Sequence, residues 1–249
     1  MDILPVKTNK LIPGRNQNLF EFLDKSILSL NEKSILAITS KIVSICEKRI
    51  VKLDKIKKNK LIAEEADYYI VNPNNKFSKL ILTVKNNILA PAAGIDESNA
   101  HGYYILWPKN PQQTANNVRK YLQKRFSLKK VGVIITDSRT IPLRWGTTGV
   151  AISHSGFLSL KNYIGKKDLF GKKLKVSVSN VADALATAAV LVMGEADEQT
   201  PLAIINDIPF VEFVDRNPSK QELAKLHVGL KDPMYTPLFK NVKWQRGKK

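Results

Sequence analysis

The stretch from Val181 to Met193 constrains the fold more than any other part of the sequence. Its residues, VADALATAAVLVM, are apolar almost all round. A helix with this sequence has to be buried on most of its faces, so it needs a core large enough to surround it. A chain of 249 residues can form such a core as one large domain or as two modest ones. Asn180 and Asp183 have the spacing of a helix N-cap, and we therefore assign Asp183 a structural role.

Shorter periodic segments predict a mixed α/β (α+β) class. Apolar residues at spacings of three and four predict helices over 18–30 and 114–126. Apolar runs predict strands over 34–39, 68–71, 80–84, 131–136 and 202–205.

No Gly/Ser linker divides the chain, so any internal boundary is soft. We predict one domain over 1–210, with two subdomains as an alternative. Residues 211–249 form a basic C-terminal extension that is interrupted by three prolines, at 218, 233 and 237. Such a stretch is typical of an extended tail that packs over the domain.

The chain is strongly basic, with 40 Lys and Arg against 22 Asp and Glu, a formal charge of +18. This balance predicts attraction to polyanions. No zinc-finger spacing, basic heptad or ribonucleoprotein signature accompanies it, so we expect a solvated lysine-rich surface and no nucleic-acid partner. No apolar run approaches the ~18 residues of a spanning helix, and the N-terminus does not resemble a signal peptide, so we expect no membrane association and a cytoplasmic location.

Two segments place polar residues directly after apolar runs in the first half of the chain. Thr39, Ser40 and Lys41 follow the strand 34–39 and could offer amides, a hydroxyl and a positive charge to phosphate. The alternative is a simple helix cap. In AAGIDESN, Asp96 and Asn99 offer the hard oxygen ligands that Mg²⁺ or Mn²⁺ prefers, although a turn stabilised by the same side chains fits equally well.

Two further segments lie in the second half. Asp137 and Ser138 end the apolar strand 131–136, where an aspartate could hold a metal over a phosphate or could merely cap the chain. Arg144 lies in a glycine-containing stretch that suits either a closing loop or plain turns. The acidic loop 194–201 contains Glu198 among three carboxylates, which either bind cations or are simply solvated. No Walker or G-x-G-x-x-G phosphate motif is present, and the three histidines are interpreted as structural.

These segments, taken in order, resemble the coenzyme F420:γ-glutamyl ligase family. The strings that carry the resemblance are TSKIVSICEKR, AAGIDESN, IITDS with RWGTTGVAI, GKKDLFGKKL and NVADALATAAVLVMGEADEQTPLAII. They span about 38–205 and leave the basic extension uncovered. The resemblance implies an α+β fold in an intertwined homodimer, with L-glutamate, GTP or ATP, and two Mg²⁺ or Mn²⁺ ions.

The resemblance also implies roles for individual residues. It makes Asp96, Asp137, Ser138 and Glu198 metal ligands. It makes Ser40 and Asn99 nucleotide contacts, joined by backbone contacts from Asn9, Lys10, Leu11 and Ile12. Lys41 and Arg144 could hold phosphate or carboxylate groups, so that Asp96, Asp137 and Arg144 form the expected catalytic set. In the implied reaction the triphosphate converts the acceptor carboxylate to an acyl phosphate, which the glutamate amine then attacks.

The chain departs from the family pattern at two places. Ile45 stands where the family commonly has a second lysine. Thr140, Ile141 and Leu143 replace a usual Gly, Arg and Trp. Because a lost arginine removes a phosphate partner, we expect an acceptor other than the phosphorylated deazaflavin F420-0, with a folate as the obvious candidate. The competing hypotheses are a non-catalytic descendant that binds nucleotide or nucleic acid, and RNA binding through the tail from Lys240.

Overall fold

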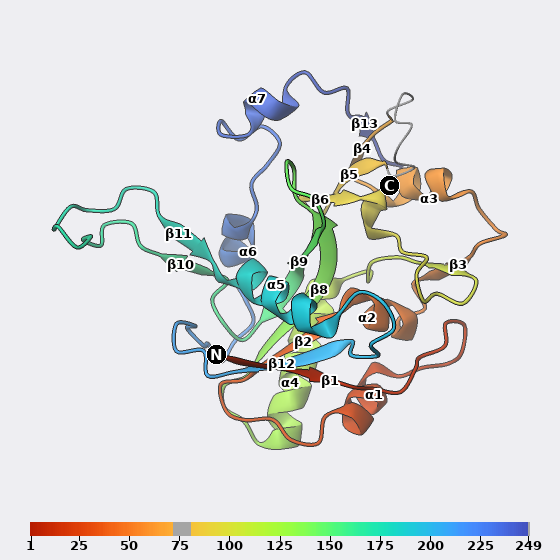
Figure 1. The fold of residues 1–249 in the computed structure, drawn as a ribbon, viewed down its shortest axis with the longest axis horizontal. Helices are drawn as coiled ribbons and strands as arrows, with labels where there is room; N and C mark the ends of the chain where they lie inside the picture. Colours follow the sequence, from red (N-terminus) through yellow and green to blue (C-terminus); the bar gives the residue numbers. More distant parts are fainter. Residues whose placement is uncertain (72–80, 249) are drawn as a thin grey trace.

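The centre of the protein is a five-stranded mixed sheet (Figure 1), so the predicted mixed α+β class is confirmed. The computed structural model describes residues 1–71 and 81–248. Across the sheet the strands are β1 (Asp2–Val6), β12 (Leu202–Asn206), β2 (Ile35–Thr39), β8 (Gly132–Thr140) and β9 (Thr147–Ser155). β2 and β8 are parallel, and the other neighbours are antiparallel. Because these two strands are parallel, the carboxyl end of β2 at Thr39 lies beside Thr136 of β8, at the same edge of the sheet.

Three helices cover one face of this sheet. They are α1 (Leu19–Ser26), α2 (Ser40–Cys46) and α4 (Pro111–Phe126). Their apolar faces form one core cluster with alternate residues of the central strands, such as Leu36 and Val133. The alternation follows from the two-residue period of a strand, which sends the intervening residues to the other face.

Helix α5 (Val181–Met193) covers the other face, where it packs on Ile35, Ala37 and Ile134. Its bounds match the prediction, and the Asn180 side chain caps it by accepting a hydrogen bond from the Asp183 amide. The expectation of burial on most faces was too strong. Its outer side is open to solvent, where Leu191 is 82% exposed.

A smaller unit packs beside the central sheet. It contains a four-stranded sheet in the order β13 (Gln245–Arg246), β4 (Tyr68–Ile70), β5 (Leu82–Lys85), β6 (Ile88–Pro91). A short ladder of β3 (Ile50–Lys52) with β7 (Tyr103–Ile105), helix α3 (Lys58–Glu65) and a 3₁₀ turn (Ala92–Gly94) complete it. Leu80, at the start of the strand predicted over 80–84, lies outside the described residues.

Two hairpins extend from the body. One is the β8–β9 turn, whose Leu143 and Trp145 are fully exposed. The other is a long arm between β10 (Leu160–Asn162) and β11 (Val178–Asn180), which projects sideways in Figure 1 and exposes Leu169 and Phe170.

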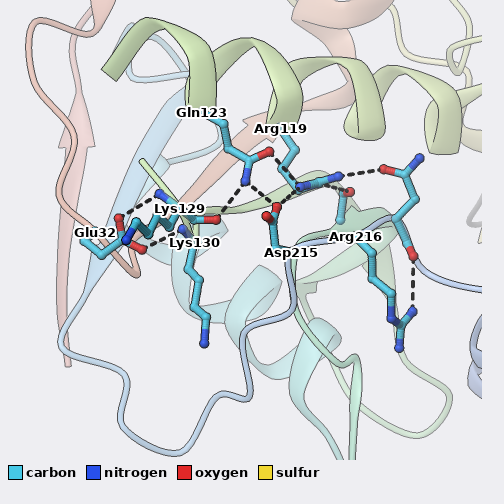
Figure 2. Close-up of polar contacts among 9 residues, drawn as sticks. Glu32, Arg119, Gln123, Lys129, Lys130, Asp215 and Arg216 are labelled. Atoms are coloured by element: carbon cyan, nitrogen blue, oxygen red, sulfur yellow. Dashed lines mark hydrogen bonds and ion pairs between the residues drawn. The ribbon is translucent and has the colours of Figure 1, made fainter. Parts of the chain in front are cut away.

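The chain after residue 210 runs back over the domain. Val211 is buried in the core beneath α5, and the Val214 amide donates to the Gly156 carbonyl. Two helices, α6 (Lys220–Leu226) and α7 (Thr236–Phe239), precede β13, which pairs with β4. Figure 2 shows the polar cluster that ties this segment to α4 through Arg119 and Asp215. The division at 210/211 stays a prediction; residue 249 lies outside the described chain.

Three predicted boundaries were wrong. The helix over 18–30 ends at Ser26 because Ile27 adopts an extended conformation, although Ile27 is still buried. The helix over 114–126 begins earlier, at Pro111, with Asn110 as its cap. The strand over 131–136 continues through Thr140, because β9 pairs with it as far as Thr147. Within residues 1–71 and 81–248, no helix has the length and apolarity to cross a membrane.

Candidate active site

A cavity of about 650 Å³ opens at the edge of the sheet where β2 ends and β8 passes beneath. Its walls come from segments far apart in the sequence. They are the N-terminal stretch 8–13, the start of α2, the loop 91–99, the β8 residues 136–138, and the end of α5 with the acidic loop that follows. This volume suits a small molecule, and convergent polar groups in such a cavity define a candidate site.

Asp137 lies on β8 at the base of the cavity. Its carboxylate accepts a hydrogen bond from the indole N–H of Trp107. Burial of the carboxylate raises the pKa of Asp137 to about 6, and the like charge of Asp96 adds to the rise. The rise in pKa is opposed by hydrogen bonds from Trp107 and the Ser138 amide and by the positive charge of Lys41. These contributions are smaller than the effect of burial.

Asp96 has the opposite electrostatic environment. Burial favours a higher pKa, but the charge of Lys41 and hydrogen bonds from Lys41 and Ser98 outweigh it, so the pKa of Asp96 lies below its usual value. The Lys41 ammonium is 2.7 Å from Asp96 Oδ2, and the Ser98 amide donates to Oδ1 at 2.7 Å. One site thus holds one firmly ionised carboxylate and one that gains a proton near pH 6.

The acidic loop after α5 forms the facing wall. Ser138 Oγ donates to Glu195 Oε1 at 2.6 Å, and the Asn99 side-chain amide donates to the Ala196 carbonyl at 2.7 Å. Glu198 folds back across Gly194 and accepts a hydrogen bond from the Ala196 amide at 2.8 Å. Hydrogen bonds from its own amide and that of Ala196 lower the pKa of Glu198.

The structure brings most of the predicted site residues together. Ten line the cavity: Asn9, Lys10, Leu11, Ile12, Lys41, Asp96, Asn99, Asp137, Ser138 and Glu198. Ser40 does not line it, because its side chain is buried at the start of α2. Arg144 lies outside it on the exposed β8–β9 turn. The metal, nucleotide and catalytic roles of all twelve residues stay predictions.

Sequence reasoning gave three residues of the site no individual functional role. Glu195, rather than Glu198, bonds to Ser138, and His101 lines the cavity. Trp107 bonds to Asp137 from 30 residues away. The sequence of the acidic loop predicted a carboxylate cluster, but it does not indicate which carboxylate faces the cavity. No local signal identifies Trp107.

The donor chemistry of the cavity fits Mg²⁺ or Mn²⁺. Asp96, Asp137, Ser138 and the acidic loop all offer hard oxygen atoms. Over the described part of the chain, no three His, Cys, Asp or Glu side chains are already gathered as a metal cluster. The Lys41 ammonium is the cation beside Asp96. A divalent ion bound to Asp96 would therefore compete with Lys41 for this carboxylate.

The fold and cavity together define an α+β protein with an acid-lined, ligand-sized site at the end of a parallel strand pair. The family model described as F420-0:Gamma-glutamyl ligase matches residues 14–207, and the chain belongs to this family.

Individual relatives agree with the family match. The chain is 44% identical over 133 residues to the coenzyme F420:L-glutamate ligase of Methanocaldococcus jannaschii, covering 53% of each protein. It is 42% identical over 130 residues to that of Methanopyrus kandleri, covering 52% of this chain and 51% of the relative. It is 35% identical over 148 residues to that of Archaeoglobus fulgidus, covering 59% and 57%. The chain spans about half the length of the curated relatives it matches.

Proposed function

We propose that the chain is a γ-glutamyl ligase that uses a nucleoside triphosphate to join L-glutamate to the carboxylate of a cofactor. The observation that carries the proposal is the cavity in which Asp96, Asp137 and Lys41 lie together, within the residues that match the family. The curated relatives bear the name coenzyme F420:L-glutamate ligase, which supports glutamate as one substrate. We propose that this protein is located in the cytoplasm.

In the proposed reaction an oxygen of the acceptor carboxylate attacks the γ-phosphorus, and the nucleoside diphosphate leaves. The glutamate nitrogen then attacks the acyl carbon, loses a proton and displaces inorganic phosphate. Lys41 would steady the transferring phosphoryl group through charge-assisted hydrogen bonds. Asp96, Asp137, Ser138 and Glu198 would hold two divalent ions, which when bound neutralise charge on phosphate oxygens. Enclosure in the cavity aligns the reacting groups and limits hydrolysis of the acyl phosphate.

The acceptor proposal rests on the departures of the chain from the family pattern. Ile42 and Ile45, on α2, are buried in the core and contribute apolar surface to the cavity lining. Ile45 stands where the family commonly has a lysine, so one expected contact with the triphosphate is replaced by an apolar side chain. The departure that bears on the acceptor is the lost arginine in the stretch 140–143, which removes a partner for the phosphate of F420-0. We propose a folate as the acceptor, with F420-0 as the alternative.

We also propose that the active form is a homodimer. Leu143, Trp145, Leu169 and Phe170 expose large apolar side chains on the two hairpins, a pattern typical of a surface that another chain covers. Arg144 lies outside the cavity of its own chain, so a second copy could bring it to a site. Light scattering coupled to size exclusion should give about twice the chain mass of 28.0 kDa; a monomer at micromolar concentration would contradict the proposal.

The activity is tested by mass spectrometry of the product. Purified protein is incubated with L-glutamate, Mg²⁺ or Mn²⁺, and GTP or ATP, with F420-0, dihydrofolate or tetrahydrofolate as acceptor. We expect phosphate release that depends on the acceptor and a product heavier by one or more glutamyl units. Extension of F420-0 alone would overturn the folate assignment. Nucleotide binding without turnover on any acceptor would favour the non-catalytic alternative.

Lys41→Met is expected to raise the KM for the triphosphate about 10-fold or more, because a charge-assisted hydrogen bond contributes roughly 1.5–3 kcal/mol. Because Lys41 also pairs with Asp96, its loss should lower thermal stability as well, so the kinetics are measured at a temperature at which both proteins are folded. Lys52→Met, on an exposed strand end outside the cavity, is the matched control. Steady-state kinetics check the prediction, and an unchanged KM would remove Lys41 from the proposed nucleotide site.

A further inference from the structure

Trp107 is a buried tryptophan whose polar atom bonds to Asp137, a residue that lines the cavity. It follows β7 and is 1% exposed, and it packs with Ile88, Ala90 and Val150 in a small core cluster. Its indole N–H donates to Asp137 Oδ2. Because an indole N–H can only donate, this contact favours the ionised carboxylate as its acceptor.

The indole is held from several sides, so it has little freedom to move. Gly94 has φ +69, and a Cβ at that position would overlap the indole ring. The Trp107 carbonyl accepts a hydrogen bond from Arg49 Nε at 3.1 Å. The Lys85 ammonium lies 5.7 Å from the ring centroid, within the range of a cation–π contact.

A partly buried ion cluster surrounds the indole in turn. Glu65 Oε2 accepts hydrogen bonds from Arg49 and Lys85, each at 2.7 Å. Glu65 is on α3, Lys85 on β5, and Arg49 precedes β3. Trp107 therefore links this ion cluster in the smaller unit to Asp137 of the central sheet.

We propose that Trp107 is a positioning residue for the cation site, which aims the Asp137 carboxylate into the cavity. The Arg49–Glu65–Lys85 cluster and Gly94 hold Trp107 in the orientation that this requires. The inference rests on the proposed function for its role in turnover, but its effect on cation binding can be measured without substrate. Groups that orient a ligating carboxylate change metal affinity by about 10–100-fold when removed.

Trp107→Phe tests the proposal, because it keeps an aromatic ring and removes the N–H. Mn²⁺ binding to the protein alone is measured by electron paramagnetic resonance at a temperature at which both proteins are folded. We expect the Mn²⁺ dissociation constant to rise about 10-fold. Trp244→Phe is the matched control, since the Trp244 indole nitrogen is buried in the C-terminal extension without a hydrogen-bond partner among the described residues. It should bind Mn²⁺ as the parent protein does.

A double-mutant cycle separates positioning from packing. If Trp107 acts through Asp137, Trp107→Phe should have no further effect on Mn²⁺ affinity in the Asp137→Asn background. Should Trp107→Phe unfold, benzothienylalanine at position 107 keeps the full ring shape without the N–H. An Mn²⁺ affinity unchanged by the loss of the N–H overturns the proposal while leaving the ligase function standing.

The remaining outcomes distinguish the role of Trp107 from the proposed ligase function. A 10-fold weaker Mn²⁺ affinity, together with no turnover on any acceptor, supports the role of Trp107 and contradicts the ligase function. If the parent protein binds no Mn²⁺, the metal site of the proposed function fails, and the role of Trp107 fails with it.

Discussion

Asp137→Asn is expected to abolish turnover and, at the same time, to stabilise the protein above pH 7. Asparagine keeps the shape and the acceptor for Trp107 but cannot supply a negative charge to a cation or phosphate site. A lost metal ligand is worth several kcal/mol of transition-state stabilisation, so we expect turnover to fall by about 10³-fold or more.

The stability gain follows from the raised pKa of Asp137. Burial brings that pKa to about 6 from an ordinary value near 3.8. Between these values the folded state binds more protons than the unfolded state, so wild-type stability falls as pH rises through about 6. Above pH 7 the ionised carboxylate should cost about 1–3 kcal/mol, which the neutral amide avoids.

Urea unfolding at pH 5 and pH 8 measures this difference. The stability advantage of Asp137→Asn should be larger at pH 8 than at pH 5. Asp54→Asn, at an exposed position, removes a carboxylate without removing a buried charge and should show no such dependence. Equal free energies of unfolding for Asp137→Asn and the parent at pH 8 would mean that the carboxylate is not desolvated in the folded protein.

The elements that sequence could predict are those governed by local chemistry. Helix α5 matched its predicted bounds, because its apolar composition and the Asn180 cap lie within the segment itself. The strands β2 and β12 also agreed closely, since buried central strands form continuous apolar runs. Predicted element boundaries were wrong where tertiary contacts determine the end of a helix or strand. The pairing of β9 carries β8 past Asp137, which the sequence placed at a strand end.

The candidate site shows the same contrast between local sequence chemistry and tertiary contacts. Residue types alone left each candidate segment open between a ligand role and a structural one, namely a cap, a turn or a solvated loop, and the roles assigned to single residues came from the family resemblance. The hydrogen bond between Glu195 and Ser138 joins residues 57 positions apart. The Trp107 contact depends equally on distant parts of the fold meeting. Such contacts leave no periodicity or spacing in the sequence, so only the structure reveals them.

The C-terminal extension illustrates how a predicted tail becomes part of the fold. The sequence predicted a basic tail that packs over the domain, and the structure attaches it through a buried arginine (Figure 2). Arg119, on α4, is 3% exposed. It donates to Ser155 at 3.1 Å in the central sheet, and to Asp215 at 3.2 Å and Asn217 at 3.0 Å in the extension.

Arg119→Met is expected to destabilise the protein by about 2–4 kcal/mol. Methionine fills much of the space but leaves the Ser155 hydroxyl and neighbouring oxygens without their donor, and each unsatisfied buried group costs about 1–3 kcal/mol. Asp215 is largely exposed and can be solvated, which keeps the cost below that of stranding a buried charge.

Arg216→Met provides the contrast for Arg119→Met, because it removes the same kind of side chain from an exposed ion pair. Arg216 bonds to Glu222 at the surface, where solvent screens the pair, so its loss should change stability little. Urea unfolding should separate the two variants, and limited proteolysis should release the extension faster from Arg119→Met. Equal unfolding midpoints would show that apolar packing, such as that of Val211, holds the extension in place. A large loss confined to Arg119→Met would identify the buried guanidinium as the attachment point, and the basic extension as an integral part of the domain.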